Sequence, residues 1–262
     1  MNKKSKNKSA LREKILSVDI STLPRQKILR LIALRARQKR RTFIFTPNTQ
    51  MLLRAQKSKF ESSVLNSSNI NIPDGSGVVI ASKLTGGKIK ARIGGIDLGE
   101  DILALSQKKS YKVFLLGSKK GVAEKAKKEL KKKYPMLDIC GTHHGYFDKF
   151  GEENERIIKM INKSRPDIIF VCMGYPTQEI WITDNADRIS SASIFIGLGG
   201  SLDVWAGNTK RAPRPLQAIG LEWLYRTVKE PKRARIFLDI PRFLFSVLKS
   251  KKSGNNSHSP II

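Results

Sequence analysis

The chain has 262 residues, of which 40% are apolar, and it carries 50 Lys and Arg against 22 Asp and Glu, a net charge of +28. This length and apolar content can close a substantial hydrophobic core, which excludes wholesale disorder. The strong positive charge indicates an anionic partner, either nucleic acid or the inner leaflet of a membrane.

The charge is concentrated at the two ends of the chain. Residues 1–41 hold 14 basic and 2 acidic side chains, and residues 209–262 hold 12 and 3. We expect residues 1–21 to form a disordered basic tail and residues 251–262 a second disordered tail. The basic start leads into no apolar segment, and no run of 18 apolar residues occurs, so we expect neither secretion nor a membrane span.

Taken in chain order, the first predicted element is a helix in LPRQKILRLIALRARQKR, residues 23–40, because its apolar residues recur at helical spacing. Continuously apolar runs then predict strands at residues 42–45, 69–72, 112–116, 137–140, 167–173 and 193–198. The amphipathic stretches between them predict helices at residues 49–66, 76–85, 96–109, 120–134, 151–163 and 177–188.

Apolar strands that alternate with helices are typical of a parallel sheet covered on both faces. We therefore predict an α/β fold, Rossmann-like and mostly parallel, for a core over residues 22–208. Residues 209–250 are expected to form a helical appendage, which Pro231 divides in two. Its second part mixes Phe, Leu and Ile with basic residues, a pattern typical of a membrane-interface helix, with packing on the core as the alternative.

Ligands of open α/β sheets bind beyond the carboxyl ends of the strands. The residues that follow five of the predicted strands are rich in Gly, Pro and small polar side chains: Thr46-Pro47-Asn48, Pro73-Asp74-Gly75, Gly117-Ser118-Lys119-Lys120-Gly121, Gly174-Tyr175-Pro176 and Gly199-Gly200-Ser201. Tight turns favour the same residue types, so each turn also has a purely structural interpretation. Their coincidence on one edge favours a binding crevice.

The turn from Gly117 to Gly121 is the candidate phosphate site, because a glycine-rich strand-to-helix turn presents backbone N–H groups to an anion such as a nucleotide diphosphate. It matches neither the P-loop pattern, since Val122 follows Gly121, nor GxGxxG. Asp74 is the candidate general base, with a turn-forming role as the alternative. Asp97 is expected to brace the start of a helix.

No metal and no cofactor are predicted. His143 and His144 are neighbours that would point to opposite faces of a strand, and the chain has no Asp-x-Asp. Phosphate charge would then be met by arginines and helix ends. Cys140 and Cys172 belong to no metal or redox motif and predict reduced thiols in a cytosolic protein.

The ordered motifs TPN, PDGSGVV, RIGGIDL, VFLLGSKKGVAEKA, GTHHGYF, MGYPTQEIW, GLGGSLDVWAG, KRAP and GLEWLYR…EP resemble the WecG/TagA/CpsF family of glycosyltransferases over about residues 22–245. The resemblance implies inverting, metal-independent transfer from a UDP-sugar to a polyprenyl-diphosphate-linked sugar, by a peripheral protein on the inner face of the cell membrane. TagA-like members move N-acetylmannosamine onto lipid-linked N-acetylglucosamine for teichoic acid synthesis, and WecG-like members move the corresponding uronic acid. The TagA-like activity is our main expectation.

The resemblance also assigns roles to individual residues. Asp74 matches the proposed catalytic base, Thr46 and Asn48 an acceptor-side polar pair, Arg92 a basic residue near the same pocket, and Gln178 the polar residue of PxQExW. The UDP-sugar is expected on the strand-end turns, at Gly117, Ser118, Lys119, Gly121, Gly174, Gly199 and Gly200.

Arg226, Arg233 and Arg235 match the appendage arginines that serve the diphosphate when family members meet the membrane. The sequence departs from the family pattern at Thr49-Gln50, where many members have Pro-Glu, and at Ser76, where a bulkier apolar residue is common. Both departures lie beside the acceptor residues, so the sugar specificity stays open.

Two alternative functions belong to other classes of protein. A basic nucleic-acid-binding protein is disfavoured, because the charge lies at the chain ends and no recognition motif accompanies it. A soluble UDP-sugar hydrolase would not need the appendage. The expected partners are a UDP-sugar, a polyprenyl-diphosphate-linked sugar and an anionic membrane surface, and homo-oligomer formation is left open.

Overall fold

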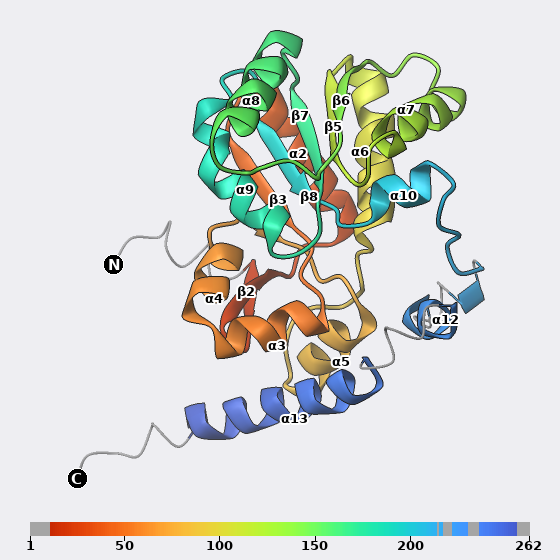
Figure 1. Cartoon of the computed structure of the whole chain (residues 1–262). Coiled ribbons are helices and arrows are strands. Elements are labelled where there is room, and N and C mark those ends of the chain that lie inside the picture. Colours follow the sequence, from red (N-terminus) through yellow and green to blue (C-terminus); the bar gives the residue numbers. More distant parts are fainter. Residues whose placement is uncertain (1–10, 214, 217–221, 230–235, 256–262) are drawn as a thin grey trace.

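The computed structural model describes residues 11–213, 215–216, 222–229 and 236–255. Its centre is a six-stranded, all-parallel sheet with the strand order β4-β3-β8-β7-β5-β6 (Figure 1). The strands are β3 (Thr42–Phe45), β4 (Ile70–Asn71), β5 (Val113–Gly117), β6 (Ile139–His143), β7 (Ile168–Cys172) and β8 (Ile194–Gly197). The prediction of an α/β fold with these six strands is confirmed.

Helices cover both faces of the sheet (Figure 1). One face packs against α3 (Thr49–Lys57), α4 (Lys59–Asn66), α8 (Glu152–Ser164) and α9 (Thr177–Asn185), which continues into the 3₁₀ turn η1 (Ala186–Arg188). The other packs against α2 (Arg25–Arg37), α6 (Gly95–Lys109), α7 (Val122–Lys133) and α10 (Ser201–Trp205). The predicted helix at 49–66 is divided, because Ser58 ends α3 and its side chain caps α4.

The central strands are apolar at every position because both of their faces are buried. In β7, Ile169 and Val171 join the cluster with α8 and α9, whereas Ile168 and Phe170 join the cluster with α2 and α6. All five residues of this strand are buried. The alternation of side chains across a strand thus supplies one core on each side of the sheet.

The expectation that residues 1–21 form a disordered tail is wrong for residues 12–21. They form an antiparallel hairpin of β1 (Arg12–Ile15) and β2 (Val18–Ser21). Ile15, Val18 and Ile20 are fully buried in the core, which orders the hairpin despite its charged neighbours. Residues 1–10 lie outside the described part of the chain.

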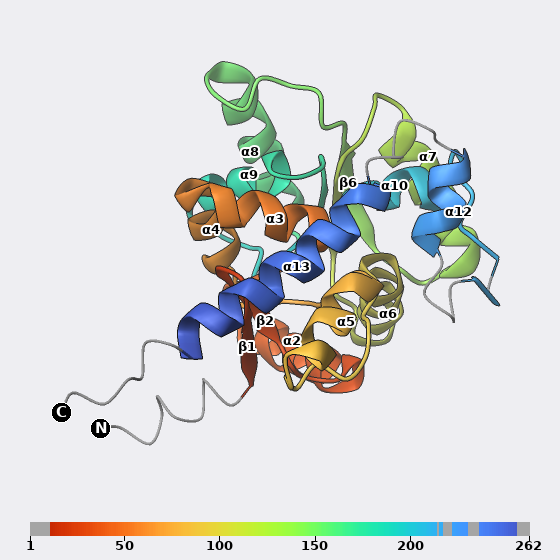
Figure 2. The same cartoon turned by 90° about the horizontal axis from the view of Figure 1, so that it is seen from below.

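The appendage is helical where it is described, in α12 (Glu222–Lys229) and α13 (Ile236–Asn255). Figure 2 shows α13 crossing beneath the molecule against α3 and α5 (Ser76–Leu84). Phe243 and Val247 of α13 are buried in the same cluster as α3 and α5, so this helix also packs on the core. The predicted disorder from residue 251 is wrong for residues 251–255, which continue α13.

Among the described residues, no helix combines the length and apolarity needed to cross a lipid bilayer.

Candidate active site at the carboxyl edge of the sheet

All six strands point the same way, so the five predicted turns lie at one edge of the sheet. Contacts between the turns confirm their proximity. An ideal Cβ on Gly95, at the start of α6, would lie 3.2 Å from Cγ2 of Thr46 and 3.4 Å from Oδ2 of Asp74. Gly121, Gly174, Gly199 and Gly200 would each place such a Cβ in open space, with no atom within 4 Å. The edge therefore leaves room for a ligand to approach the backbone.

Asp74 follows β4 and is partly buried beside Arg92. Its Oδ1 lies 3.4 Å from Nε of Arg92, and the two side chains are 28% and 25% exposed. The turn is held by backbone hydrogen bonds from Asp74 N to Pro47 O (3.3 Å) and from Ile93 N to Pro73 O (3.0 Å). The carboxylate is thus accessible and lies next to a cation. That Asp74 acts as a general base stays a prediction.

Thr46 and Asn48, the predicted acceptor-side pair, both hold the local backbone. The buried Thr46 hydroxyl donates to Gly197 O (3.1 Å), which ties the ends of β3 and β8 together. Asn48 caps α3, and its Oδ1 accepts from the backbone N–H groups of Gln50 and Met51 at 3.0 and 3.1 Å. Contact of either side chain with a sugar stays a prediction.

Gln178 lies in the first turn of α9 and is 2% exposed. Its Oε1 accepts from the backbone N–H groups of Gly174 (3.2 Å) and Gly199 (2.9 Å), and its Nε2 donates to Oε1 of Glu179 (2.8 Å). One amide therefore joins the turns that follow β7 and β8. The described contacts give Gln178 a positioning role, and direct substrate contact stays a prediction.

Glu179 is a buried acid that the sequence did not single out as functional. Burial raises its pKa to about 7, and its Oε2 has no hydrogen-bond partner among the described residues. Because the unfolded side chain titrates near pKa ~4.3, the folded protein retains a proton that the unfolded chain releases between these values. The stability that this group contributes is therefore fully present at about pH 4 and is lost as pH rises through 7.

We expect Glu179→Gln to raise the free energy of unfolding by roughly 2–4 kcal/mol at pH 8 and to change it little at pH 4.5. The glutamine keeps an acceptor for Gln178 but never ionises. Urea unfolding at both pH values measures the difference, with Glu152→Gln on the exposed face of α8 as the control. Equal effects at the two pH values would contradict the assignment.

The turn from Gly117 to Gly121 leads from β5 into α7. Both positions favour glycine. A Cβ on Gly117 would lie 2.2 Å from Cys172 O of the neighbouring strand, and Gly121 has a left-handed φ of 84°. The Ser118 hydroxyl donates to Oδ2 of Asp203 in α10 at 2.7 Å. Sequence reasoning missed Asp203, whose signal was its place just after the Gly199-Gly200 turn.

A pocket of about 420 Å³ adjoins this turn. Its lining combines two cations with two rings: Lys119, Lys120, His144 and Tyr146. The expectation that His143 and His144 point to opposite faces is wrong, because His144 lies beyond the end of β6 and the rings are 4.3 Å apart. Within the described part of the chain, no three His, Cys, Asp or Glu side chains gather as metal ligands would. That the protein uses no metal stays a prediction.

The first residues of the appendage contact the core beside the candidate active-site edge. Arg211 donates to Oδ1 of Asp97 in the first turn of α6 at 2.7 Å. That Asp97 braces this helix start stays a prediction. Gln50, one of the departures from the family pattern, donates to Asp239 of α13 at 2.7 Å.

The three appendage arginines are not placed at the site. Arg226 belongs to α12, but its side chain lies outside the described part of the structure, as do Arg233 and Arg235 altogether. Their roles stay predictions.

Comparison with known proteins gives one consistent result. The family model for "Glycosyl transferase WecG/TagA/CpsF family" matches residues 13–257. The N-acetylglucosaminyldiphosphoundecaprenol N-acetyl-beta-D-mannosaminyltransferase of Bacillus subtilis (strain 168) is 38% identical over 216 residues, 82% of each chain. A protein of the same name from Bacillus spizizenii is 35% identical over 84% of each chain. Another from Staphylococcus aureus (strain MW2) is 36% identical over 80% of this chain and 81% of that protein.

Proposed function

Because this chain belongs to the WecG/TagA/CpsF family of glycosyl transferases, we propose that it moves N-acetylmannosamine from a UDP-sugar to polyprenyl-diphosphate-linked N-acetylglucosamine. The observation that carries the proposal is the pairing of Asp74 with Arg92 at the open edge of the sheet, in a chain whose similar relatives bear that activity in their name.

The proposed reaction is a single displacement at the anomeric carbon. The acceptor hydroxyl oxygen attacks that carbon, its proton passes to the Asp74 carboxylate, and the bond to the β-phosphate oxygen breaks to release UDP. Attack opposite the leaving group inverts the anomeric configuration. A positioned base of this kind is typically worth about 10²–10⁴-fold in rate.

Donor binding is assigned to the turn from Gly117 to Gly121. The N–H groups at the start of α7 and the exposed Lys119 offer donors and positive charge to a diphosphate. The pocket beside Lys119 and Tyr146 offers room for the rest of the nucleotide. Gly199 and Gly200, in the turn that follows β8, leave open space for the sugar.

The acceptor is a lipid, so the site must meet a membrane, and α13 with α5 is the surface that fits. We call this surface the α5/α13 face. Its exposed apolar side chains are Ile80, Leu84, Phe237, Leu238, Phe245 and Leu248. Basic side chains accompany them: Lys83, Arg242, Lys249 and Lys251. Apolar insertion combined with attraction to anionic lipid is typical of interfacial helices.

The experiment that tests the function offers the protein a lipid-diphosphate-linked N-acetylglucosamine and a panel of UDP-sugars, and measures released UDP. We expect release with UDP-N-acetylmannosamine, and only when the lipid acceptor is present. Preference for the N-acetylmannosaminuronic acid donor would assign the WecG-like activity instead. Release without acceptor would indicate a hydrolase, and failure with every lipid acceptor would contradict the proposal.

A further inference from the structure

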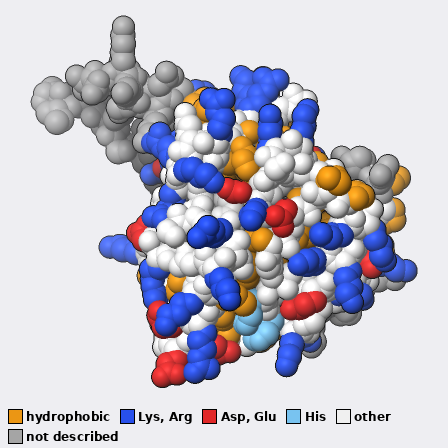
Figure 3. Space-filling model, turned by 90° about the horizontal axis from the view of Figure 1, so that it is seen from above, with side chains coloured by type: hydrophobic (Ala, Val, Ile, Leu, Met, Phe, Trp, Pro, Cys, Tyr) orange, Lys and Arg blue, Asp and Glu red, His pale blue; other side chains and the backbone are white. Residues whose placement is uncertain are grey.

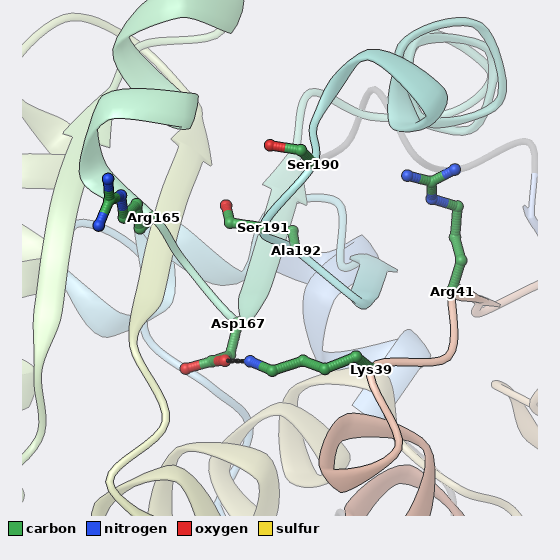
Figure 4. A pocket seen from close by; sticks show the side chains of 7 residues that line it. All are labelled: Lys39, Arg41, Arg165, Asp167, Ser190, Ser191 and Ala192. Atoms are coloured by element: carbon green, nitrogen blue, oxygen red, sulfur yellow. Dashed lines mark hydrogen bonds and ion pairs between the residues drawn. The ribbon is translucent and has the colours of Figure 1, made fainter.

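A second pocket, of about 650 Å³, lies at the opposite edge of the sheet from Asp74, where β3, β7 and β8 begin. We call it the amino-edge pocket. Its lining comes from the segments that precede these three strands: Lys39, Arg41, Arg165, Asp167, Ser190, Ser191 and Ala192 (Figure 4). No role in the proposed transfer falls on any of these residues.

The pocket holds an excess of positive charge. Lys39 pairs with Asp167, and Arg41 pairs with Asp187 outside the pocket. Arg165 is exposed, and its guanidinium makes no hydrogen bond or ion pair with any described residue. In Figure 4 the Arg165 and Arg41 guanidinium groups flank the two serines from opposite sides. Figure 3 shows the surrounding face rich in Lys and Arg, which raises the local concentration of anions.

The backbone at two of the cations favours glycine. Lys39 and Arg165 have φ angles of 51° and 49°, in the left-handed region that residues with a Cβ adopt only at an energetic penalty. Each follows a helix, where glycine is the common residue in this conformation. The chain instead carries a long cation at both positions, and both cations line the same pocket.

Two polar atoms at the pocket lack partners. Ser191 Oγ and Arg41 Nε are buried and make no hydrogen bond with the described residues. Such groups are uncommon in folded proteins, and a bound ion is one partner that would satisfy them. A phosphate oxygen accepts hydrogen bonds from hydroxyl and guanidinium N–H groups alike, so an anion in the pocket is a suitable partner for such groups.

From these four observations we propose that the amino-edge pocket is a second anion site, which binds a soluble, phosphate-bearing ligand of diphosphate size or larger. Arg165 and Arg41 would contact the phosphates from either side, and Ser190 and Ser191 would donate hydroxyl hydrogen bonds. The site is independent of the transferase edge. It also lies at the far end of the molecule from the α5/α13 face (Figure 1), so the ligand is a free anion rather than a lipid headgroup.

Titration calorimetry of the full chain with inorganic pyrophosphate tests the proposal. We expect Arg165→Gly to weaken one pyrophosphate site by about 10- to 100-fold, since a charge-assisted contact is lost. Glycine suits the left-handed backbone, so this variant keeps its fold. Ser191→Ala should weaken the same site by a smaller factor. Lys163→Met is the matched control, an exposed cation in the last turn of the helix that Arg165 follows; it does not line the pocket and should bind as wild type.

Lys119→Met distinguishes the two candidate anion sites. It should leave unchanged the pyrophosphate affinity of the site that Arg165→Gly weakens. Unchanged binding by Arg165→Gly, or an equal loss in Lys163→Met, would overturn the proposal. Vesicles that contain phosphatidic acid test whether the pocket binds a lipid headgroup instead. Arg165→Gly should bind these vesicles as the wild type does. A loss confined to vesicles would assign the pocket to a headgroup and overturn the proposal. None of these results depends on the transfer reaction.

Discussion

Replacing Asp74 with Asn is expected to lower kcat for sugar transfer by about 10²–10⁴-fold while UDP binds nearly as in the wild type. The amide keeps the size of the side chain but accepts no proton from the acceptor hydroxyl. Donor binding is assigned to the Gly117–Gly121 turn, so the loss should fall on kcat. Steady-state kinetics of UDP release and calorimetry with UDP measure the two quantities separately.

The matched control for this variant is Asp101→Asn. Asp101 lies on α6 and pairs with Arg25 at 2.5 Å, with no role in the proposed transfer. Its substitution should leave turnover unchanged, because a partly exposed ion pair contributes at most about 1 kcal/mol to stability. Near-normal turnover by Asp74→Asn, in a variant that unfolds at the wild-type temperature, would remove Asp74 from the role of base.

The double variant Leu238→Ser/Phe245→Ser is expected to weaken binding to anionic vesicles by about 30- to 1,000-fold. These side chains of α13 are 60% and 69% exposed, so the substitutions spare the core contacts of Phe243 and Val247. Insertion of the two apolar side chains into lipid is worth roughly 2–4 kcal/mol together. Co-sedimentation with vesicles measures the loss, and turnover with the lipid acceptor should fall in parallel.

Met136→Ser is the control for an exposed apolar side chain elsewhere on the molecule. Met136 is 81% exposed and lies between α7 and β6, away from the α5/α13 face. Its vesicle binding should equal that of the wild type. Wild-type vesicle binding by the double variant would show that a different surface meets the membrane. Retention of duplex DNA at moderate salt, with no vesicle binding, would favour the nucleic-acid alternative.

The sheet could be predicted from the sequence because each strand is buried on both faces. In runs such as DIIFVCM every residue after the first is apolar. Such runs separated by helices permit few arrangements other than a parallel α/β sheet. The same logic placed the turns at one edge, since parallel strands end together. The candidate site therefore followed from the fold class and the positions of the strand ends.

The N-terminal hairpin could not be predicted by the same reasoning. Its two strands have four residues each, and Arg12, Lys14 and Asp19 interrupt the apolar pattern. The turn at Leu16-Ser17 lacks the Gly or Asn that marks such turns, although Leu16 adopts a φ of 55°. What orders the hairpin is burial of Ile15, Val18 and Ile20 against distant elements, which local sequence does not reveal.

Side-chain roles at the site were harder still to predict. The family resemblance placed Gln178 at the site, but only the structure shows that its Oε1 accepts from Gly174 N and Gly199 N and so joins two turns. Asp203 was overlooked, although it meets Ser118 across the same edge. Which way a polar side chain turns depends on tertiary partners that are far apart in sequence, so residue type and position alone do not decide it.

The product of the reaction tests the central claim most directly. With UDP-N-acetylmannosamine, lipid-diphosphate-linked N-acetylglucosamine and anionic vesicles, NMR of the isolated product reports the anomeric configuration of the new linkage. Single displacement with Asp74 as base predicts a β-linked N-acetylmannosamine on the lipid-linked sugar, with one UDP released per linkage. An α-linked product, or UDP release with free sugar and no lipid-linked disaccharide, would contradict it.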